Sequence, residues 1–400
     1  MSERAAPGTA ASASAVVDVP LWRRPRVRGI VYQAVLCLVV ALLAWAAIAN
    51  VSENLARANI ATGFDFWNVT AGFDISQTLI PYSAQASTYG RAFWVGLLNT
   101  LLVAVLGIVL ATVLGFLIGI GRLSHNFLVS KLCGGYVELI RNVPLLLQLL
   151  FWYNAVLKAL PEIRESVALP GGGYLNNRGL FLPDPQIAGG GAVALALVAG
   201  IVLAIGFRAL HERIGPLGRG RGRTVVSTLL VLVPPLATAV VVGVSVTFAY
   251  PEMGRFNIRG GLEVLPEFVA LLTGLSIYTA AFIAEAVRAG LMAVPKGQTE
   301  AASALGLRRG AALRLVIVPQ AMRVIVPPLT NQYLNLTKNS SLAVAIGYPD
   351  LVQIFTGTVL NNTGQAIEVV VVTMAVYLSL SLATSALMNW YNAWITPAER

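Results

Sequence analysis

Apolar runs long enough to cross a lipid bilayer recur along this chain and constrain its fold more than any other feature. A hydrocarbon core of about 30 Å requires a helix of about 20 predominantly apolar residues. Composition agrees, because 56% of the residues are hydrophobic and only 12% are charged, against roughly 25% charged in soluble domains. The sequence therefore predicts an all-α integral membrane protein, with seven clear spans near residues 29–49, 93–120, 136–158, 187–207, 224–249, 268–291 and 369–390.

An eighth span, over 324–347, is left open by hydropathy because ten of the twelve residues from Thr330 to Ser341 are polar. With eight spans and a cytoplasmic N-terminus, 19 of the 28 lysines and arginines fall in cytoplasmic segments, eight fall outside, and Arg141 is embedded. Cytoplasmic loops of membrane proteins carry an excess of basic residues. The distribution supports this orientation without deciding between seven and eight spans.

The few reactive side chains exclude several chemistries. Cys37 and Cys133 form neither a disulfide framework nor a CxxC pair, and His125 and His211 have no second ligand at metal-binding spacing. We therefore expect no metal site. The net charge of +10 is explained by basic cytoplasmic loops, so nucleic acid is not an expected partner.

The sequence shows no catalytic constellation and no ATPase site. A P-loop ends in Gly-Lys to hold phosphate, and none of the four lysines follows a glycine: Lys131, Lys158, Lys296 and Lys338 follow Ser, Leu, Pro and Thr. No serine or cysteine nucleophile has a histidine nearby in sequence. We expect neither a catalytic residue nor a cofactor in this chain.

One face of the second clear span consists of small residues. Gly107, Ala111, Gly115 and Gly119 recur every four residues, which places them on one side of a helix. Such faces let two membrane helices approach closely. We expect helix packing here, in preference to contact with a ligand.

The loop after the 268–291 span contains a short helix of its own. Pro295 favours a helix start and Gly306 a helix stop, which predicts a helix over Lys296 to Leu305. Ala301, Ala302 and Leu305 share one small, mildly apolar face, which suits close seating in a groove of another protein. Three neighbouring arginines keep the loop cytoplasmic: Arg308, Arg309 and Arg314.

This loop resembles the EAA loop of the inner-membrane permeases of ABC importers. The matching residues are Glu300-Ala301-Ala302, Gly306 and the run Val316-Ile317-Val318-Pro319, in which two valines replace the usual Ile and Leu. Two further stretches resemble polar amino acid permeases: 138–148, which begins Glu-Leu-Ile-Arg-Asn, and 331–342. The resemblance covers roughly 90–158 and 267–392, implies a five-helix core, and supports the eighth span.

The resemblance also implies a domain organisation like that of the longer general L-amino acid permeases. The first span ends in Ala47-Ile48-Ala49, which mimics a signal-peptidase site, but its length favours a retained helix. The expected segments are a disordered cytoplasmic tail (1–28), an extra transmembrane helix with a periplasmic loop (29–89), the first part of the core (90–158), an insertion with two helices (159–266), the second part of the core (267–392) with the EAA loop at 285–319, and a cytoplasmic tail (393–400).

Two groups of residues are candidates for function. We expect the residues that contact an ATPase to be Glu300, Ala301, Ala302, Leu305, Gly306 and Arg308. Charged side chains are costly in a span and face a partner helix or a pathway, so the substrate-pathway candidates are Glu138, Arg141, Gln148, Asn335, Lys338, Asn339 and Ser340. A local Glu138–Arg141 ion pair and an interhelical hydrogen-bond network near Lys338 remain alternatives.

The implied function is import of amino acids across a bacterial inner membrane by alternating access. The implied partners are a homologous permease subunit, in a homodimer or heterodimer, a cytoplasmic ATPase dimer that uses ATP, a periplasmic amino acid-binding protein, and membrane lipid. An ion-gradient-driven secondary transporter is the main alternative and predicts an intramembrane carboxylate path, for which the sequence offers only Glu138 and Glu285 near span ends. A membrane-embedded enzyme is the third.

The predicted topology is tested by labelling single cysteines from each side of the membrane. Positions near Asn59, Asn176, Arg259 and Asn362 should react from the periplasm, and a position near Gly310 should not. Labelling of position 362 only from the cytoplasm would remove the eighth span.

Overall fold

The computed structural model of the chain describes residues 25–57, 62–214, 221–243, 245–254 and 257–395. The chain forms two units, residues 1–64 with 363–365, and residues 65–362 with 366–400. In the first unit, α1 (Pro25–Arg57) covers the predicted first span and exposes its apolar side chains. Most of the predicted N-terminal tail and residues 396–400 of the C-terminal tail lie outside the described residues.

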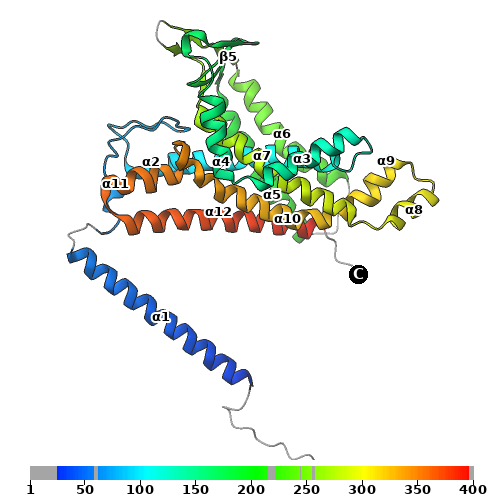
Figure 1. The fold of residues 1–400 in the computed structure, drawn as a ribbon, viewed down its shortest axis with the longest axis horizontal. Coiled ribbons are helices and arrows are strands. Elements are labelled where there is room, and N and C mark those ends of the chain that lie inside the picture. Colours follow the sequence, from blue (N-terminus) through cyan, green and yellow to red (C-terminus); the bar gives the residue numbers. More distant parts are fainter. Residues whose placement is uncertain (1–24, 58–61, 215–220, 244, 255–256, 396–400) are drawn as a thin grey trace, which may run out of the picture. The chain divides into compact units, whose positions relative to one another are not determined.

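Long helices dominate the second unit (Figure 1). Within the described residues, seven helices are long and apolar enough to span a membrane. One of them, Arg309–Ile346, covers nearly all of the segment 324–347 that hydropathy had left open. The all-α class is therefore confirmed. The helices after α1 are α2 (Tyr89–Gly121), α3 (Phe127–Asn142), α4 (Leu145–Leu150), α5 (Gly190–Ile214), α6 (Arg221–Val242), α7 (Pro266–Met292), α8 (Lys296–Ala304), α9 (Arg309–Ala312), α10 (Val318–Asn339), α11 (Leu360–Thr363) and α12 (Ala366–Ile395).

Shorter helical turns of 3₁₀ or π geometry connect these helices. Two of them continue α10 beyond its end and lead back toward α12, separated by Gly347, whose φ of 77° is left-handed. The turns are η2 (Asp65–Asn68), η3 (Phe151–Leu157), η4 (Ile163–Glu165), η5 (Leu313–Ile317), η6 (Ser340–Ile346) and η7 (Val352–Val359). We refer to the end at which α2, α7 and α12 begin as the outer end, following the predicted orientation.

Helix α7 is the centre of the core and packs against α2, α10, α3 and α4. The predicted small-residue face of α2 is confirmed as its contact surface. A Cβ atom built on Gly115 would lie 2.5 Å from Ile283 Cγ2, and one built on Gly119 would lie 2.7 Å from the Ala284 carbonyl oxygen. The two helices run parallel, with their backbones nearly touching.

The span predicted over 136–158 is not one helix. Pro144 disfavours a helical conformation at the residue before it, and Val143 is extended, so α3 ends at Asn142 and α4 begins at Leu145. Gln148 compensates for the break, because its Nε2 donates to the carbonyl oxygens of Ile140 and Val143, each at 2.9 Å. Carbonyl groups at a buried helix end require such partners.

Short strands flank the helix pair of the insertion, and the sequence analysis did not predict them. Helices α5 and α6 pack on one another, but residues 245–249, expected at the end of a helix, form a strand. The strands make one four-stranded antiparallel sheet and two strand pairs: β1 (Val167–Leu169), β2 (Gly173–Asn176), β3 (Gly179–Leu182) and β8 (Leu262–Val264); β4 (Asp184–Ala188) with β5 (Ser245–Ala249); β6 (Glu252–Met253) with β7 (Ile258–Arg259).

The α2–α7 contact can be tested with leucine at a glycine. Gly119→Leu should separate the two helices, because its Cβ would meet the α7 backbone at Ala284. Overpacking of this kind forces the backbone to shift, which costs about 1–3 kcal/mol of stability or more. We expect a lower melting temperature in detergent. Gly135→Leu on α3 is the matched control, since a Cβ there meets nothing within 4 Å. Equal melting temperatures for the two variants would contradict the packing.

Candidate functional site

A groove opens at the outer end of α10, between η6, η7 and α12. Its volume is about 460 Å³. Lys338, a predicted pathway residue, lies at this groove with its side chain exposed, and the neighbouring Ser341 lines it as well. The remaining lining residues come from η7 and α12: Val352, Thr373, Met374, Tyr377, Leu378 and Ser381.

Polar groups in this groove differ in whether the protein already satisfies them. Ser341 Oγ donates to the Lys338 carbonyl oxygen at 2.7 Å, and Thr373 Oγ1 donates to the Val369 carbonyl oxygen at 2.8 Å. Ser381 Oγ is buried and has no hydrogen-bond partner among the described residues. A buried hydroxyl without a partner is costly. The Ser381 hydroxyl and the Lys338 ammonium are therefore the groups of the groove best placed to bind a ligand.

A buried carboxyl group supports the wall of the groove. Asp350 is 1% exposed; its Oδ2 accepts a hydrogen bond from the Tyr377 hydroxyl at 3.2 Å, and its Oδ1 accepts one from the Gln353 N–H at 2.8 Å. Burial raises the pKa of the Asp350 carboxyl to about 7, although these hydrogen bonds oppose the rise. Asp350 and Tyr377 were not candidates from the sequence.

Two polar residues of α2 hold the segment that carries Asp350. Asn99 Nδ2 donates to the carbonyl oxygens of Pro349 and Gln77, each at 2.9 Å. Thr100 Oγ1 accepts a hydrogen bond from the Leu351 N–H at 3.0 Å. Both side chains are fully buried. An Asn-Thr pair inside an apolar run was the available signal for this contact, because buried polar groups require partners.

The other predicted pathway residues on α10 and η6 have different environments. Asn335 is exposed, Asn339 is half-buried, and Ser340 is fully buried. Ser340 Oγ donates to the Thr337 carbonyl oxygen at 2.8 Å, and its side chain also interacts with the Tyr377 hydroxyl. Ser340 therefore supports the wall of the groove from behind.

The predicted pathway residues around α3 are not in this groove. Gln148 bridges the helix break described above. The Arg141 guanidinium lies over the Phe282 ring, 5.1 Å from its centroid, and Glu138 is exposed. Within the described residues no ion pair joins Glu138 to Arg141. The structure therefore divides the predicted pathway residues between two places.

The short helix predicted after the 268–291 span has the ends that the sequence predicts, to within one residue. Helix α8 follows Pro295 and is terminated by Gly306, whose φ of 72° is left-handed. The Leu307 N–H donates to the Ala302 carbonyl oxygen at 3.1 Å, and the Gly306 N–H donates to that of Ser303 at 2.9 Å. These two bonds form a Schellman motif.

Of the three residues expected to form the docking face of α8, two are exposed and one is buried. Ala302 is 3% exposed and packs within the chain, so it does not belong to a free docking surface, whereas Leu305 is 81% exposed. Ala301 is exposed as well. The helix is tied to α10, because Gln320 Nε2 donates to Gln298 Oε1 at 3.0 Å. The two charged candidates of this loop are also exposed: Glu300 and Arg308.

Comparison with known proteins agrees with this architecture. Residues 219–399 match the family described as binding-protein-dependent transport system inner membrane component. The chain is 52% identical over 381 residues to the general L-amino acid transport system permease protein AapQ of Rhizobium johnstonii, covering 94% of each. It is 42% identical over 408 residues to the glutamate/glutamine/aspartate/asparagine transport system permease protein BztB of Rhodobacter capsulatus, covering 94% of this chain and 95% of the relative.

Among solved structures, the chain is similar to an amino acid ABC transporter crystallised with histidines. The identity is 22% with a TM-score of 0.46, over 76% of this chain and 94% of that one. The near full-length relatives and the family match define a multi-pass membrane permease. The chain belongs to the inner-membrane permeases of binding-protein-dependent ABC importers. The secondary-transporter alternative gains no support from these relatives.

Replacing the groove lysine tests its role. Lys338→Met should lower the maximal rate of ATP-dependent uptake at least about tenfold, because the groove loses its cation and a charge-assisted hydrogen bond contributes about 1.5–3 kcal/mol. Insertion into the membrane should be unchanged. Lys131→Met on α3 makes the same exchange outside the groove and should transport normally. Unaltered uptake by Lys338→Met across several amino acids would make the residue structural.

Proposed function

We propose that this chain is the membrane-spanning subunit of an ATP-driven importer of amino acids in a bacterial inner membrane. Both near full-length relatives are named for amino acid transport, which supports this substrate class. Its expected partners are a homologous permease, a cytoplasmic ATPase dimer and a periplasmic amino acid-binding protein. ATP is used by the ATPase, and this chain binds no cofactor.

The observation that carries the proposal is α8. Its nine residues begin after a proline and end in a Schellman motif, so both helix ends are defined within the chain and its conformation does not depend on a partner. Leu305 projects from it with most of its surface exposed. An exposed leucine beside a small alanine fits a shallow apolar groove in another protein.

Helix α10 gives a physical route from α8 to the groove. The Gln298–Gln320 hydrogen bond attaches α8 near the first turn of α10, and Lys338 lies in its last turn. The 22 residues of α10 extend about 33 Å at 1.5 Å per residue. Movement of an ATPase groove against α8 would reach the outer end through this helix, as alternating access requires.

The expected pathway runs past the groove at Lys338. Its ammonium would receive the carboxylate of an amino acid, and the Ser381 hydroxyl would offer a further hydrogen bond. Asn335 and Asn339 lie on the same helix end, and Asn335, which precedes Lys338 by three residues, would extend the polar surface toward the inner end. Glu138, Arg141 and Gln148 would act from the broken span of α3 and α4.

The docking role is tested by three variants of the loop. Gly306→Val should misdirect the chain after α8, because a β-branched residue adopts left-handed φ only at a cost of about 1–2 kcal/mol or more. Ala301→Arg should block seating by bulk and charge. Ser303→Arg is the matched control, because Ser303 is exposed two positions away on the opposite side of the helix. We expect the first two variants to lose co-purification with the ATPase, and the control to retain it.

Ala302 is left unchanged in this series, because it packs within the chain and an arginine there would disturb the fold itself. Each variant is measured for its amount in the membrane, for co-purification and for uptake in vesicles. Wild-type coupling by both Gly306→Val and Ala301→Arg would show that this loop does not transmit ATP hydrolysis to transport.

A further inference from the structure

We infer that the insertion completes a receiving site for free α-amino acids at the outer end of the core, an inference that rests on the proposed function. A hollow of about 300 Å³ lies where the insertion meets the core. This volume is at the low end of the roughly 300–1,000 Å³ of small-molecule pockets, and so it suits a small solute. The core and the insertion each contribute a basic and an acidic residue to its lining.

Four charged side chains surround the hollow. The basic ones are Lys158 of the core and Arg178 of the insertion; the acidic ones are Glu263 of the insertion and Glu267 at the start of α7. Within the described residues no ion pair joins any two of them, although opposite charges share one small space. An α-amino acid carries one carboxylate and one ammonium group. The hollow therefore presents unneutralised charges of both signs to a ligand of this class, with Arg178 able to bind the carboxylate through two parallel hydrogen bonds.

Tyr153 orients the charged groups on the core side. Its hydroxyl donates to Glu267 Oε1 at 2.7 Å, and Lys158 Nζ lies 4.4 Å from the centroid of its ring. One aromatic side chain thus contacts both a cation and a carboxylate of the hollow. These contacts restrict the freedom of two long side chains before a ligand arrives, which lowers the entropy lost on binding.

The insertion side is held by the turn between β2 and β3. Asn176 is fully buried; its Oδ1 accepts a hydrogen bond from the Arg178 N–H at 2.8 Å, and its Nδ2 donates to Ser166 Oγ at 2.9 Å. Gly179, which follows Arg178, has a φ of 138°, and a Cβ there would lie 2.4 Å from the Val264 carbonyl oxygen. The turn that presents Arg178 is therefore fixed by the sheet.

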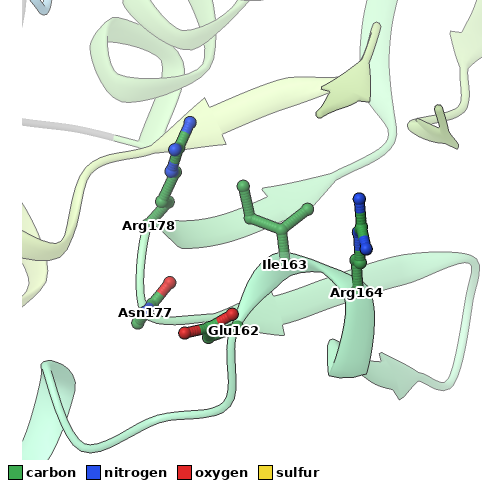
Figure 2. Close-up of a pocket in the computed structure, with 5 residues that line it drawn as sticks. All are labelled: Glu162, Ile163, Arg164, Asn177 and Arg178. Carbon is green, nitrogen blue, oxygen red and sulfur yellow. The ribbon is translucent and has the colours of Figure 1, made fainter. Parts of the chain in front are cut away.

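Arg178 and Asn177 also line a second hollow. This hollow is about 350 Å³ and is lined by Glu162, Ile163, Arg164, Asn177 and Arg178. Figure 2 shows Arg178 and Arg164 extending in the same direction on either side of Ile163, with Glu162 beside Asn177 near the turn. Both hollows carry charges of both signs, but the hollow that reaches the core draws them from the core as well as from the insertion, so it is favoured as the receiving site.

The test measures amino acid binding in the absence of the binding protein. The permease complex with its ATPase, in nanodiscs, is titrated with radiolabelled L-glutamine. Arg178→Gln and Glu263→Gln should each raise the half-saturating concentration at least about tenfold, because loss of a hydrogen bond to a charged group costs about 1.5 kcal/mol or more. Glutaramic acid, which lacks the α-ammonium group, and 4-aminobutanamide, which lacks the α-carboxylate, should compete poorly.

Two control variants make the same exchanges away from the hollow. Arg259→Gln and Glu252→Gln change exposed residues of β7 and β6 and should bind L-glutamine like the wild type. In proteoliposomes with the binding protein, the hollow variants should raise the KM of uptake and keep the maximal rate.

Three results would overturn the inference. The first is absence of L-glutamine binding by the wild type, and the second is wild-type affinity for L-glutamine in both hollow variants. The third is a loss of affinity in these variants only for the binding protein, and this result would make the hollow a protein-docking surface. ATP-dependent uptake by the wild type separates failure of the receiving site from failure of the proposed function. If uptake of amino acids persists in these cases, the proposed function stands and the receiving site alone is wrong.

Discussion

The contact between the bare backbones of α2 and α7 supports the rest of the structure. In lipid, burial of apolar side chains gives little drive for helix association, so close packing takes its place. Glycines on α2 supply that closeness toward α7, and Gly107 extends it to α10, where a Cβ would lie 3.2 Å from Leu336. Lys338 follows two residues later. The position of the groove thus depends on the glycines of α2, which have no side chain and so let α7 and α10 approach closely.

Features encoded by neighbouring residues were predictable from the sequence. Most of the apolar runs form a spanning helix whatever they pack against, because a backbone in lipid must satisfy its own hydrogen bonds, although Pro144 divides the run over 136–158. The bounds of α8 followed from Pro295 and Gly306, because the backbone preferences of proline and glycine act within the segment itself. The polar half of α10 was the exception: hydropathy left it open, and only the resemblance to permeases supported a helix there.

Features that depend on distant residues were not predictable. The Asp350–Tyr377 hydrogen bond and the Asn99 contact with Pro349 join residues far apart in sequence. Ala302 shares a helical face with Ala301 and Leu305, but its exposure is decided by what packs against it. The strands of the insertion are two to five residues long, too short for a clear alternation of polar and apolar residues beside strongly apolar helices.

The pairing of β3 with β8 has a consequence for how the chain is divided. Leu182 and Leu262 are partners across this pair, and Asp184 and Ala249 are partners in the next. The chain therefore leaves the sheet and returns to it at adjacent points, with α5 and α6 between. The helix pair is therefore an insertion whose two ends lie side by side in the sheet. Its length can change without altering the distance between the core helices on either side, so this module can evolve independently of the permease that carries it.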